Sequence, residues 1–174
     1  MTEWSTIGVL MNADVSKAKY SESRKSRLFR LKMNFFPAYR GTGARVIHIS
    51  DNLLEVIIKL PFNWTTNNYV GSIFGGSIYA SVDPVYMIML IRLLGKDYIV
   101  WDKSATIKFI KPGKETLYAR FELDKNSVEK YRAELEEKHS IDKVFSVELV
   151  NKAGLVHALI EKTIYMRKKE NKNV

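Results

Sequence analysis

The feature that most constrains the fold is a long apolar segment, Gly76 to Leu94, which is hydrophobic on every face of the helix it would form. Ile, Val, Leu, Met and Tyr side chains recur through it, and Asp83 is its one carboxylate. A helix that is apolar all round must be buried. Gly95 is well placed to end it, because glycine adopts the left-handed cap conformation at little cost. The segment therefore predicts a central helix around which the rest of the chain wraps.

The pair Asp83-Pro84 leaves the start of this helix open. Asp is favoured as an N-cap and Pro at the first helical position, so local rules begin a helix at this pair. A helix that begins near Gly75 would instead be kinked by Pro84, at a cost of about 3 kcal/mol or more. Local propensity alone favours the first interpretation. An aspartate inside an apolar helix is costly to bury unpaired, so Asp83 should have partners or a function.

Strand patterns surround the central helix. Alternating or β-branched stretches predict strands at 44–50, 53–60, 104–111, 117–123, 143–151 and 155–167. Asp51-Asn52 is a hairpin turn signal, and residues 16–33 predict a helix or helix pair that ends before Pro37. Asn126 and Glu129 resemble a capping box that opens a short helix. This order predicts an α+β protein whose mostly antiparallel sheet surrounds one dominant helix.

Composition narrows the classes of function. The chain has 174 residues, which is the size of one domain, and no cysteine, so a disulfide framework, a thiolate metal site and a cysteine nucleophile are excluded. The N-terminus does not resemble a secretory signal, and the apolar run 84–91 is shorter than the ~20 residues of a spanning helix. We therefore expect a soluble, cytoplasmic protein. The net charge of +9 favours polyanionic partners such as nucleic acid, anionic lipid or coenzyme A.

One spaced motif precedes the central helix. The pattern Asn68-x-x-Gly71-x-x-Phe74-Gly75-Gly76, followed by Asp83, resembles the signature of hotdog-fold acyl-CoA thioesterases of the phenylacetyl-CoA thioesterase type. Those enzymes have Asn, Gly and His-Gly-Gly, with an acidic residue in the helix at the same spacing. The resemblance implies a hotdog domain at 34–168, preceded by an N-terminal helical segment at 1–33 and followed by a basic tail at 169–174. It also implies that the central helix begins near Gly75.

The resemblance implies a catalytic role for Asp83, Gly75 and Asn68. The Gly75 N–H would face the thioester carbonyl, and Asp83 would act as general base or nucleophile, contributed by the partner subunit of a homodimer. We expect further substrate contacts from Gly71, Phe74, Gly76, Asp102 and Ser104, the last two on one face of the following strand. Phe74 stands where the family has its histidine, and a phenyl ring cannot hydrogen-bond a thioester. Three alternatives follow: the site catalyses hydrolysis with Asn68, Gly75 and Asp83 and no histidine, it hydrolyses thioesters weakly, or it only binds acyl groups.

The sequence thus predicts an acyl-CoA thioesterase that releases a free carboxylic acid and coenzyme A. A homodimer or homotetramer is expected, with no metal, no cofactor beyond the coenzyme A of the substrate, and no nucleic-acid or membrane partner. Coenzyme A phosphates could be bound by Arg24, Lys25 and Arg27, or by Lys111 and Lys114. The alternatives are a non-catalytic acyl-CoA-binding hotdog protein, a nucleic-acid binder that uses the basic N-terminal helix, and a hotdog dehydratase.

Overall fold

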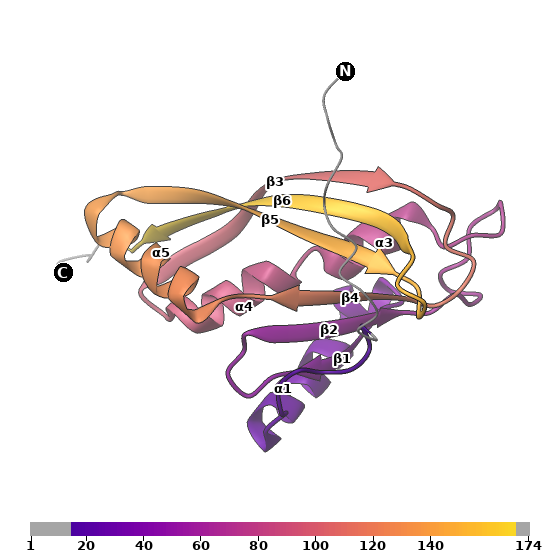
Figure 1. Cartoon of the computed structure of the whole chain (residues 1–174), viewed down its shortest axis with the longest axis horizontal. Helices are drawn as coiled ribbons and strands as arrows, with labels where there is room; N and C mark the ends of the chain where they lie inside the picture. Colours follow the sequence, from indigo (N-terminus) through magenta and orange to yellow (C-terminus); the bar gives the residue numbers. More distant parts are fainter. Residues whose placement is uncertain (1–14, 170–174) are drawn as a thin grey trace.

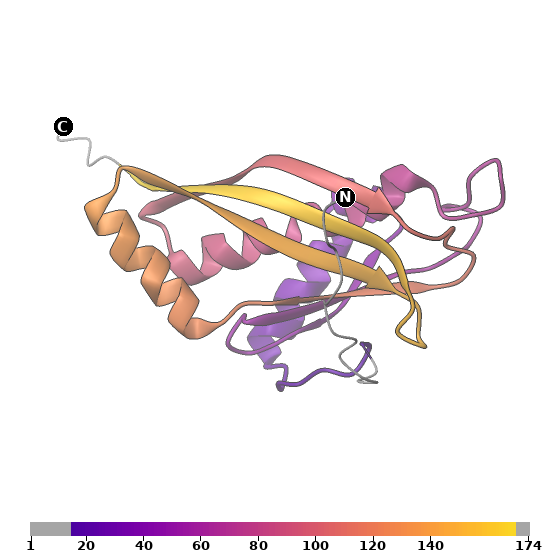
Figure 2. The same cartoon turned by 45° about the horizontal axis from the view of Figure 1, so that its top comes forward.

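The structure is a computed structural model that describes residues 15–169. Its elements, in order, are α1 (Arg24–Phe35), α2 (Pro37–Gly41), β1 (Arg45–Ile49), β2 (Glu55–Leu60), α3 (Gly75–Val82), α4 (Val85–Leu94), β3 (Tyr98–Phe109), β4 (Leu117–Glu122), α5 (Lys125–Glu137), β5 (Ser140–Val150) and β6 (Val156–Lys168). The strands form one antiparallel sheet in the order β1-β2-β4-β5-β6-β3. The sheet curves around α3 and α4 (Figures 1 and 2). The predicted hotdog architecture is confirmed.

The helix start favoured by local propensity is wrong. The central helix begins at Gly75 and is kinked at Asp83-Pro84, and both of these residues keep right-handed helical dihedral angles. The Asp83 N–H still donates to the Tyr79 carbonyl at 3.1 Å, as in a continuous helix. The aspartate caps nothing with its side chain. Tertiary packing overrides the local signal because both halves of this helix bury apolar side chains against the same sheet.

The central helix packs its apolar side chains into the core. Its inward face includes Ile78, Val82 and Leu90, which are almost fully buried. Tyr86 packs edge-on against Phe121 of β4, with ring centroids 5.0 Å apart. From Gly75 to Leu94 the helix is long and apolar enough to cross a bilayer by length and composition, a property that the core helices of soluble proteins share. The sheet wrapped around it accounts for that composition.

Further boundaries differ from the sequence prediction. The predicted N-terminal helix begins at Arg24 rather than at 16, and β5 begins at Ser140 rather than at 143. The starts of β3 and α5 differ as well. β3 begins at Tyr98 rather than at 104, because it pairs with β6 as far as Lys168. α5 is capped by Asp124, whose carboxylate accepts the Ser127 N–H at 2.9 Å, and not by Asn126. In both places the element is longer than its sequence pattern because a tertiary or capping partner extends it.

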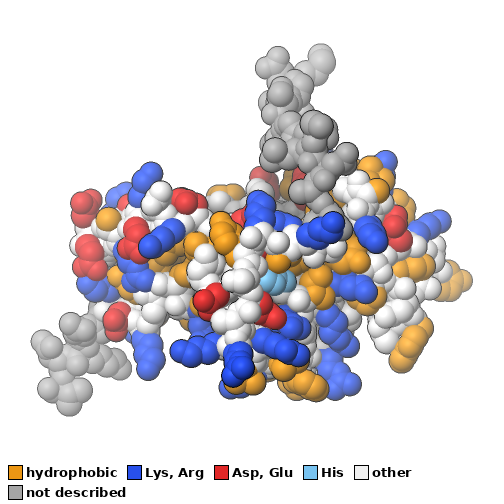
Figure 3. Space-filling model, turned by 60° about the horizontal axis from the view of Figure 1, so that its bottom comes forward, with side chains coloured by type: hydrophobic (Ala, Val, Ile, Leu, Met, Phe, Trp, Pro, Cys, Tyr) orange, Lys and Arg blue, Asp and Glu red, His pale blue; other side chains and the backbone are white. Residues whose placement is uncertain are grey.

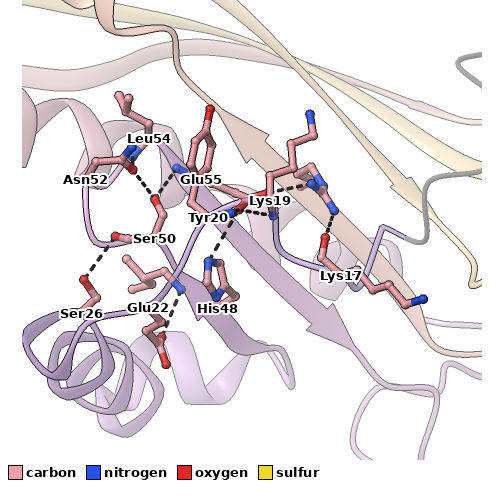
Figure 4. A network of polar contacts seen from close by, with 12 residues as sticks. Lys17, Lys19, Tyr20, Glu22, Ser26, His48, Ser50, Asn52, Leu54 and Glu55 are labelled. Atoms are coloured by element: carbon pink, nitrogen blue, oxygen red, sulfur yellow. Dashed lines mark hydrogen bonds and ion pairs between the residues drawn. The ribbon is translucent and has the colours of Figure 1, made fainter.

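The chain before α1 is held on the outside of the sheet by a buried carboxylate, Glu55 of β2. Its oxygens accept hydrogen bonds from the backbone N–H of Lys19 and Tyr20 and from the Arg120 guanidinium, the last at 2.7 Å (Figure 4). His48 lies 3.6 Å from the same carboxylate. A fully buried charge is tolerated only when it is paired and hydrogen-bonded in this way. The N-terminal segment from residue 17 onward is thus part of the packed fold.

The two edge strands of the sheet, β1 and β3, differ in whether other groups bond to their outer backbone atoms. At β1, the Asn34 side chain donates to the Val46 carbonyl and accepts the Val46 N–H, both at 2.8 Å, as a neighbouring strand would. Glu22 accepts the Ile49 N–H on the same strand. β3 forms the other edge, is 12 residues long and pairs only with β6 among the described strands. Long open edges are where sheets add further strands.

Candidate functional site

The loop before the central helix is organised by Asn68. Its side-chain oxygen accepts the backbone N–H of Val70 and of Ser72, both at 3.0 Å, and its amide donates to the Ser72 hydroxyl at 3.0 Å. Gly71 lies within this loop at a φ of +74°, a conformation that glycine adopts freely. The hydrogen bonds recorded for Asn68 therefore all remain within its own loop, where they set the path of the chain towards Gly75.

The N-terminus of α3 borders a cavity of about 300 Å³ whose lining includes Asn68, Gly75 and Lys111. The N-cap residue is Phe74, whose side chain offers no acceptor to the first turn, so this helix end presents backbone N–H groups and a partial positive charge. The Phe74 ring lies over Gly76, where a Cβ would come within 2.3 Å of it. A side chain at position 76 would therefore displace the exposed Phe74 ring.

Asp83 lies at the kink of the central helix and is the centre of a second polar cluster. Its carboxylate accepts from the Tyr79 hydroxyl at 2.9 Å and from the Lys162 ammonium of β6 at 3.1 Å. Lys162 also donates to the Asp83 backbone carbonyl and lies 2.9 Å from the Asp102 carboxylate of β3. The Lys162 side chain is 0% exposed, whereas those of Asp83 and Asp102 are 43% and 21% exposed. One buried cation therefore joins two carboxylates, and the half-exposed one is Asp83.

The environment perturbs two groups of this cluster. Burial raises the pKa of Asp102, and the neighbouring Asp83 adds to the rise, although Lys162 opposes both. The Asp102 Oδ1 atom is buried and has no hydrogen-bond partner. Burial, reinforced by the bond to Asp83, raises the pKa of Tyr79 to about 12. The Tyr79 hydroxyl thus stays protonated at neutral pH and donates a hydrogen bond to the Asp83 carboxylate.

The expectation that Ser104 shares the face of Asp102 is wrong. Asp102 pairs with Ile164, whose side chain points to the core, whereas Ser104 pairs with the adjacent Thr163, because the register shifts between 102 and 104. Consecutive strand residues point to opposite faces, so this β-bulge turns Ser104 away from the cluster. Asp102 points inward toward Lys162, and Ser104 is exposed on the other side of the sheet.

Asp83 also borders a second cavity, of about 480 Å³, between α1, α2 and the central helix. Its lining is mostly apolar and consists of Phe29, Lys32, Met33, Phe36, Ala38, Tyr39, Thr42, Ala80, Asp83, Pro84, Met87 and Ile88. The Tyr39 hydroxyl donates to the Ser81 carbonyl at 3.2 Å, and the Thr42 hydroxyl donates to the Tyr39 carbonyl at 2.7 Å. Asp83 is accordingly the one carboxylate among the residues that line this cavity, whose size is typical for small-molecule ligands.

Within one chain, Asp83 does not meet the other two predicted catalytic residues, Asn68 and Gly75, which line one cavity together. Gly75 and Asp83 are separated by eight residues of helix, or about 12 Å at 1.5 Å per residue. They also border different cavities. Lys111 lines the cavity at Gly75, whereas Lys114, Arg24, Lys25 and Arg27 line neither cavity. A single subunit thus carries two halves of the predicted site.

Sequence reasoning missed two residues of the Asp83 cluster, Tyr79 and Lys162. For Lys162 a signal could have been recognised. The signal was present, because in β6 the inward positions follow a period of two: Ala158, Ile160, Lys162, Ile164 and Met166. A lysine at one of these apolar positions indicates a buried cation that needs anionic partners.

Among residues 15–169, no group of three or more His, Asp or Glu side chains is arranged to hold a metal ion.

Comparisons with known proteins agree with this architecture. Solved structures that resemble the chain include a Pseudomonas aeruginosa protein of unknown function that is called a probable thioesterase (TM-score 0.72, 19% identity, covering 83% of this chain and 96% of that one). A Haemophilus influenzae thioesterase is similar over 90% of this chain and 98% of its own, with a TM-score of 0.62 and 11% identity. A protein of unknown function from Chlorobaculum tepidum has a TM-score of 0.68 at 13% identity, covering 83% of this chain and 95% of that one.

At these identities the structural matches show the fold alone. No curated protein matches the chain. A family described as a domain of unknown function, DUF4442, matches residues 24–166, which is most of the sequence and includes α1, the central helix and the strands up to the last two residues of β6. The chain therefore belongs to the DUF4442 family and has a thioesterase-like hotdog fold.

Proposed function

We propose that the protein is an acyl-CoA thioesterase in which Asp83 is the catalytic carboxylate. The observation that carries this proposal is the placement of Asp83: a half-exposed carboxylate, held by Tyr79 and Lys162, at the wall of a mostly apolar cavity. An apolar acyl group suits that cavity. Lys111 beside the helix N-terminus is a suitable partner for the phosphates of coenzyme A.

The proposed chemistry is hydrolysis by general base catalysis. Asp83 takes a proton from water while the water oxygen attacks the thioester carbonyl carbon. The negative charge that develops on the carbonyl oxygen is stabilised by the N–H groups at the start of α3, including that of Gly75. The C–S bond then breaks, the acyl group leaves as a carboxylic acid, and the coenzyme A thiolate takes up the proton.

The site is completed in this proposal by a second copy of the chain. The β1 edge is closed by Asn34, so the open β3 edge is the one available for pairing with a partner sheet. A two-fold axis that brings Gly75 near the partner subunit's Asp83 also brings Asp83 near Gly75 of the partner subunit. Each dimer then holds two identical sites, and the separation of about 12 Å within one chain is no obstacle.

The primary test is thiol release from a panel of short, long and aromatic acyl-CoAs. We expect turnover by the wild type and its loss in Asp83→Asn. The matched control is Asp142→Asn, which alters an exposed carboxylate paired with Lys103 and should retain full turnover. Retained turnover in Asp83→Asn would remove that residue from the mechanism.

A second test asks whether the site is shared between subunits. Gly75→Pro removes one N–H donor, and proline is tolerated at the first position of a helix. Asp83→Asn and Gly75→Pro should each be inactive alone, but their mixed dimers regain one intact site of two. Random mixing then restores roughly a quarter of wild-type activity. A mixture that stays inactive while subunits exchange argues against a shared site.

The alternative function is acyl-CoA binding without hydrolysis, and Phe74 is the observation that favours it. The phenyl ring lies over Gly76 at the helix N-terminus and supplies no hydrogen bond there. Calorimetric binding of acyl-CoA, with no thiol released from any substrate of the panel, would select this function over the thioesterase.

A further inference from the structure

α1 presents an apolar stripe to solvent. Leu28, Leu31 and Phe35 are 54%, 41% and 72% exposed, and they lie at positions i, i+3 and i+7, on one side of the helix. Phe36, which follows α1 directly, is 62% exposed. Single exposed hydrophobic residues are ordinary on protein surfaces, whereas a contiguous apolar stripe marks an interaction surface.

The other side of α1 is already in use. Ser26 and Met33 are buried, and the Ser26 hydroxyl donates to the Ser50 carbonyl at 3.2 Å. At 100° per residue, these two positions lie opposite the stripe of Leu28, Leu31 and Phe35. The helix is therefore fixed to the domain by one face, and its second apolar face points away from the protein.

The stripe is bordered by positive charge. Arg24, Lys25, Arg27 and Lys32 are exposed on the same helix, which contains no acidic residue. Figure 3, with the bottom of Figure 1 turned forward, shows Lys and Arg side chains interspersed with hydrophobic ones on the side where α1 lies. Helices that lie in the surface of a bilayer combine an apolar face with flanking Lys and Arg in this way.

We propose that α1 docks the protein on the surface of an anionic lipid bilayer, with the stripe at the headgroup boundary and the basic side chains on lipid phosphates. A second copy of this chain fits the face less well, because it would bring two clusters of positive charge together. Nucleic acid would satisfy the charges but not the exposed Leu and Phe side chains. This proposal differs from the sequence-based expectation that the protein has no membrane partner.

The docking face adjoins the cavity that contains Asp83. Lys32 and Phe36 of this face also line that cavity, together with Phe29 and Met33 from the same helix. If the proposed thioesterase function holds, an acyl chain from the bilayer could enter the cavity beside α1. The docking itself does not depend on hydrolysis.

The test is co-sedimentation of the full chain with vesicles of phosphatidylcholine alone or mixed with phosphatidylglycerol. We expect at least about tenfold stronger binding to the anionic vesicles, falling as salt is raised from about 0.05 to 0.5 M. Phe35→Glu should reduce binding about tenfold or more, because it places a negative charge in the stripe. Val144→Glu, a change to an exposed apolar residue of β5, is the matched control and should leave binding unchanged.

Circular dichroism would check that both variants fold. The vesicle assay needs no substrate, so its result is separate from that of the thiol-release assay. Equal affinity for neutral and anionic vesicles, or no binding to either, would overturn the proposal. So would sedimentation velocity data in which Phe35→Glu converts an oligomer to smaller species, since the stripe would then be an interface between copies.

Discussion

Replacing Lys162 by Met should be strongly destabilising, because it removes the cation that joins two carboxylates and leaves the space filled. Lys162 is 0% exposed and has three acceptors: the Asp83 carbonyl, the Asp83 carboxylate at 3.1 Å and the Asp102 carboxylate at 2.9 Å. Methionine has a side chain of similar length, so a large cavity is not created. The measured loss then reports the electrostatic interaction rather than the packing.

The magnitude follows from which carboxylate is left without a partner. The Asp83 side chain is 43% exposed and can be solvated, so leaving it without its cation costs little free energy. Asp102 is more buried, and its Oδ1 atom already lacks a partner. Removing one partner of a buried ion pair costs about 3–5 kcal/mol. We expect a decrease of this size in the free energy of unfolding from urea titration followed by circular dichroism.

Two variants make this prediction specific. Lys103→Met breaks an exposed pair with Asp142 and should cost no more than about 1 kcal/mol. Adding Asp102→Asn to Lys162→Met removes the uncompensated charge and should recover part of the stability. A loss below about 1 kcal/mol in Lys162→Met, equal to that of the surface control, would refute the view that this lysine is required by its buried partner.

Three further predictions concern pH, backbone strain and the closed sheet edge. Burial raises the pKa of Asp102, so the folded protein binds the proton of this carboxyl group more tightly than the unfolded chain does. This tighter binding stabilises the fold fully below an aspartate's ordinary pKa of about 3.9, and the stabilisation is lost as pH rises through the pKa of the folded state. In urea titrations, the free energy of unfolding of the wild type minus that of Asp102→Asn should therefore fall as pH rises through this range. A difference that does not change with pH would contradict the prediction. Gly43→Ala should destabilise by at least about 1 kcal/mol, because Gly43 has φ +83° and a Cβ would meet Thr66 at 2.3 Å. Both glycine variants are compared in thermal melts. Gly41→Ala adds a Cβ in open space within α2 and should be neutral or stabilising, so an equal loss of stability in the two variants would count against strain at Gly43. Asn34→Ala should cost about 1–3 kcal/mol by leaving two backbone groups of β1 unpaired, and unchanged hydrogen exchange in β1 would contradict this.

The sequence predicted the fold well where patterns were long. The all-apolar segment ending at Gly95 indicated a buried helix, and that helix is the core of the structure. The strand-like stretches placed the strands correctly along the chain, because alternation reports directly which face of a strand is buried. The hairpin at Asp51-Asn52 was identified from its turn residues for the same local reason.

The candidate site was predictable only in part. Asp83 stood out as a carboxylate in an apolar helix, and the motif at Asn68 and Gly75 indicated where that helix begins. The turn of Ser104 away from Asp102 was not predictable, because the β-bulge arises from pairing with β6. The partner of Asp83, Lys162, lies 79 residues further along the chain, and only the folded sheet brings the two together.

By itself, then, the sequence determined the elements, their order and the residue whose burial demands an explanation. These depend on periodicity and on the local conformational preferences of Gly, Pro and Asp, which act within a few residues. The tertiary structure decided whether Asp83 caps a helix or lies inside one, and which cation neutralises it. Those outcomes depend on contacts between distant segments, where burial of both helix halves against one sheet outweighs the local preference for a new helix at Pro84.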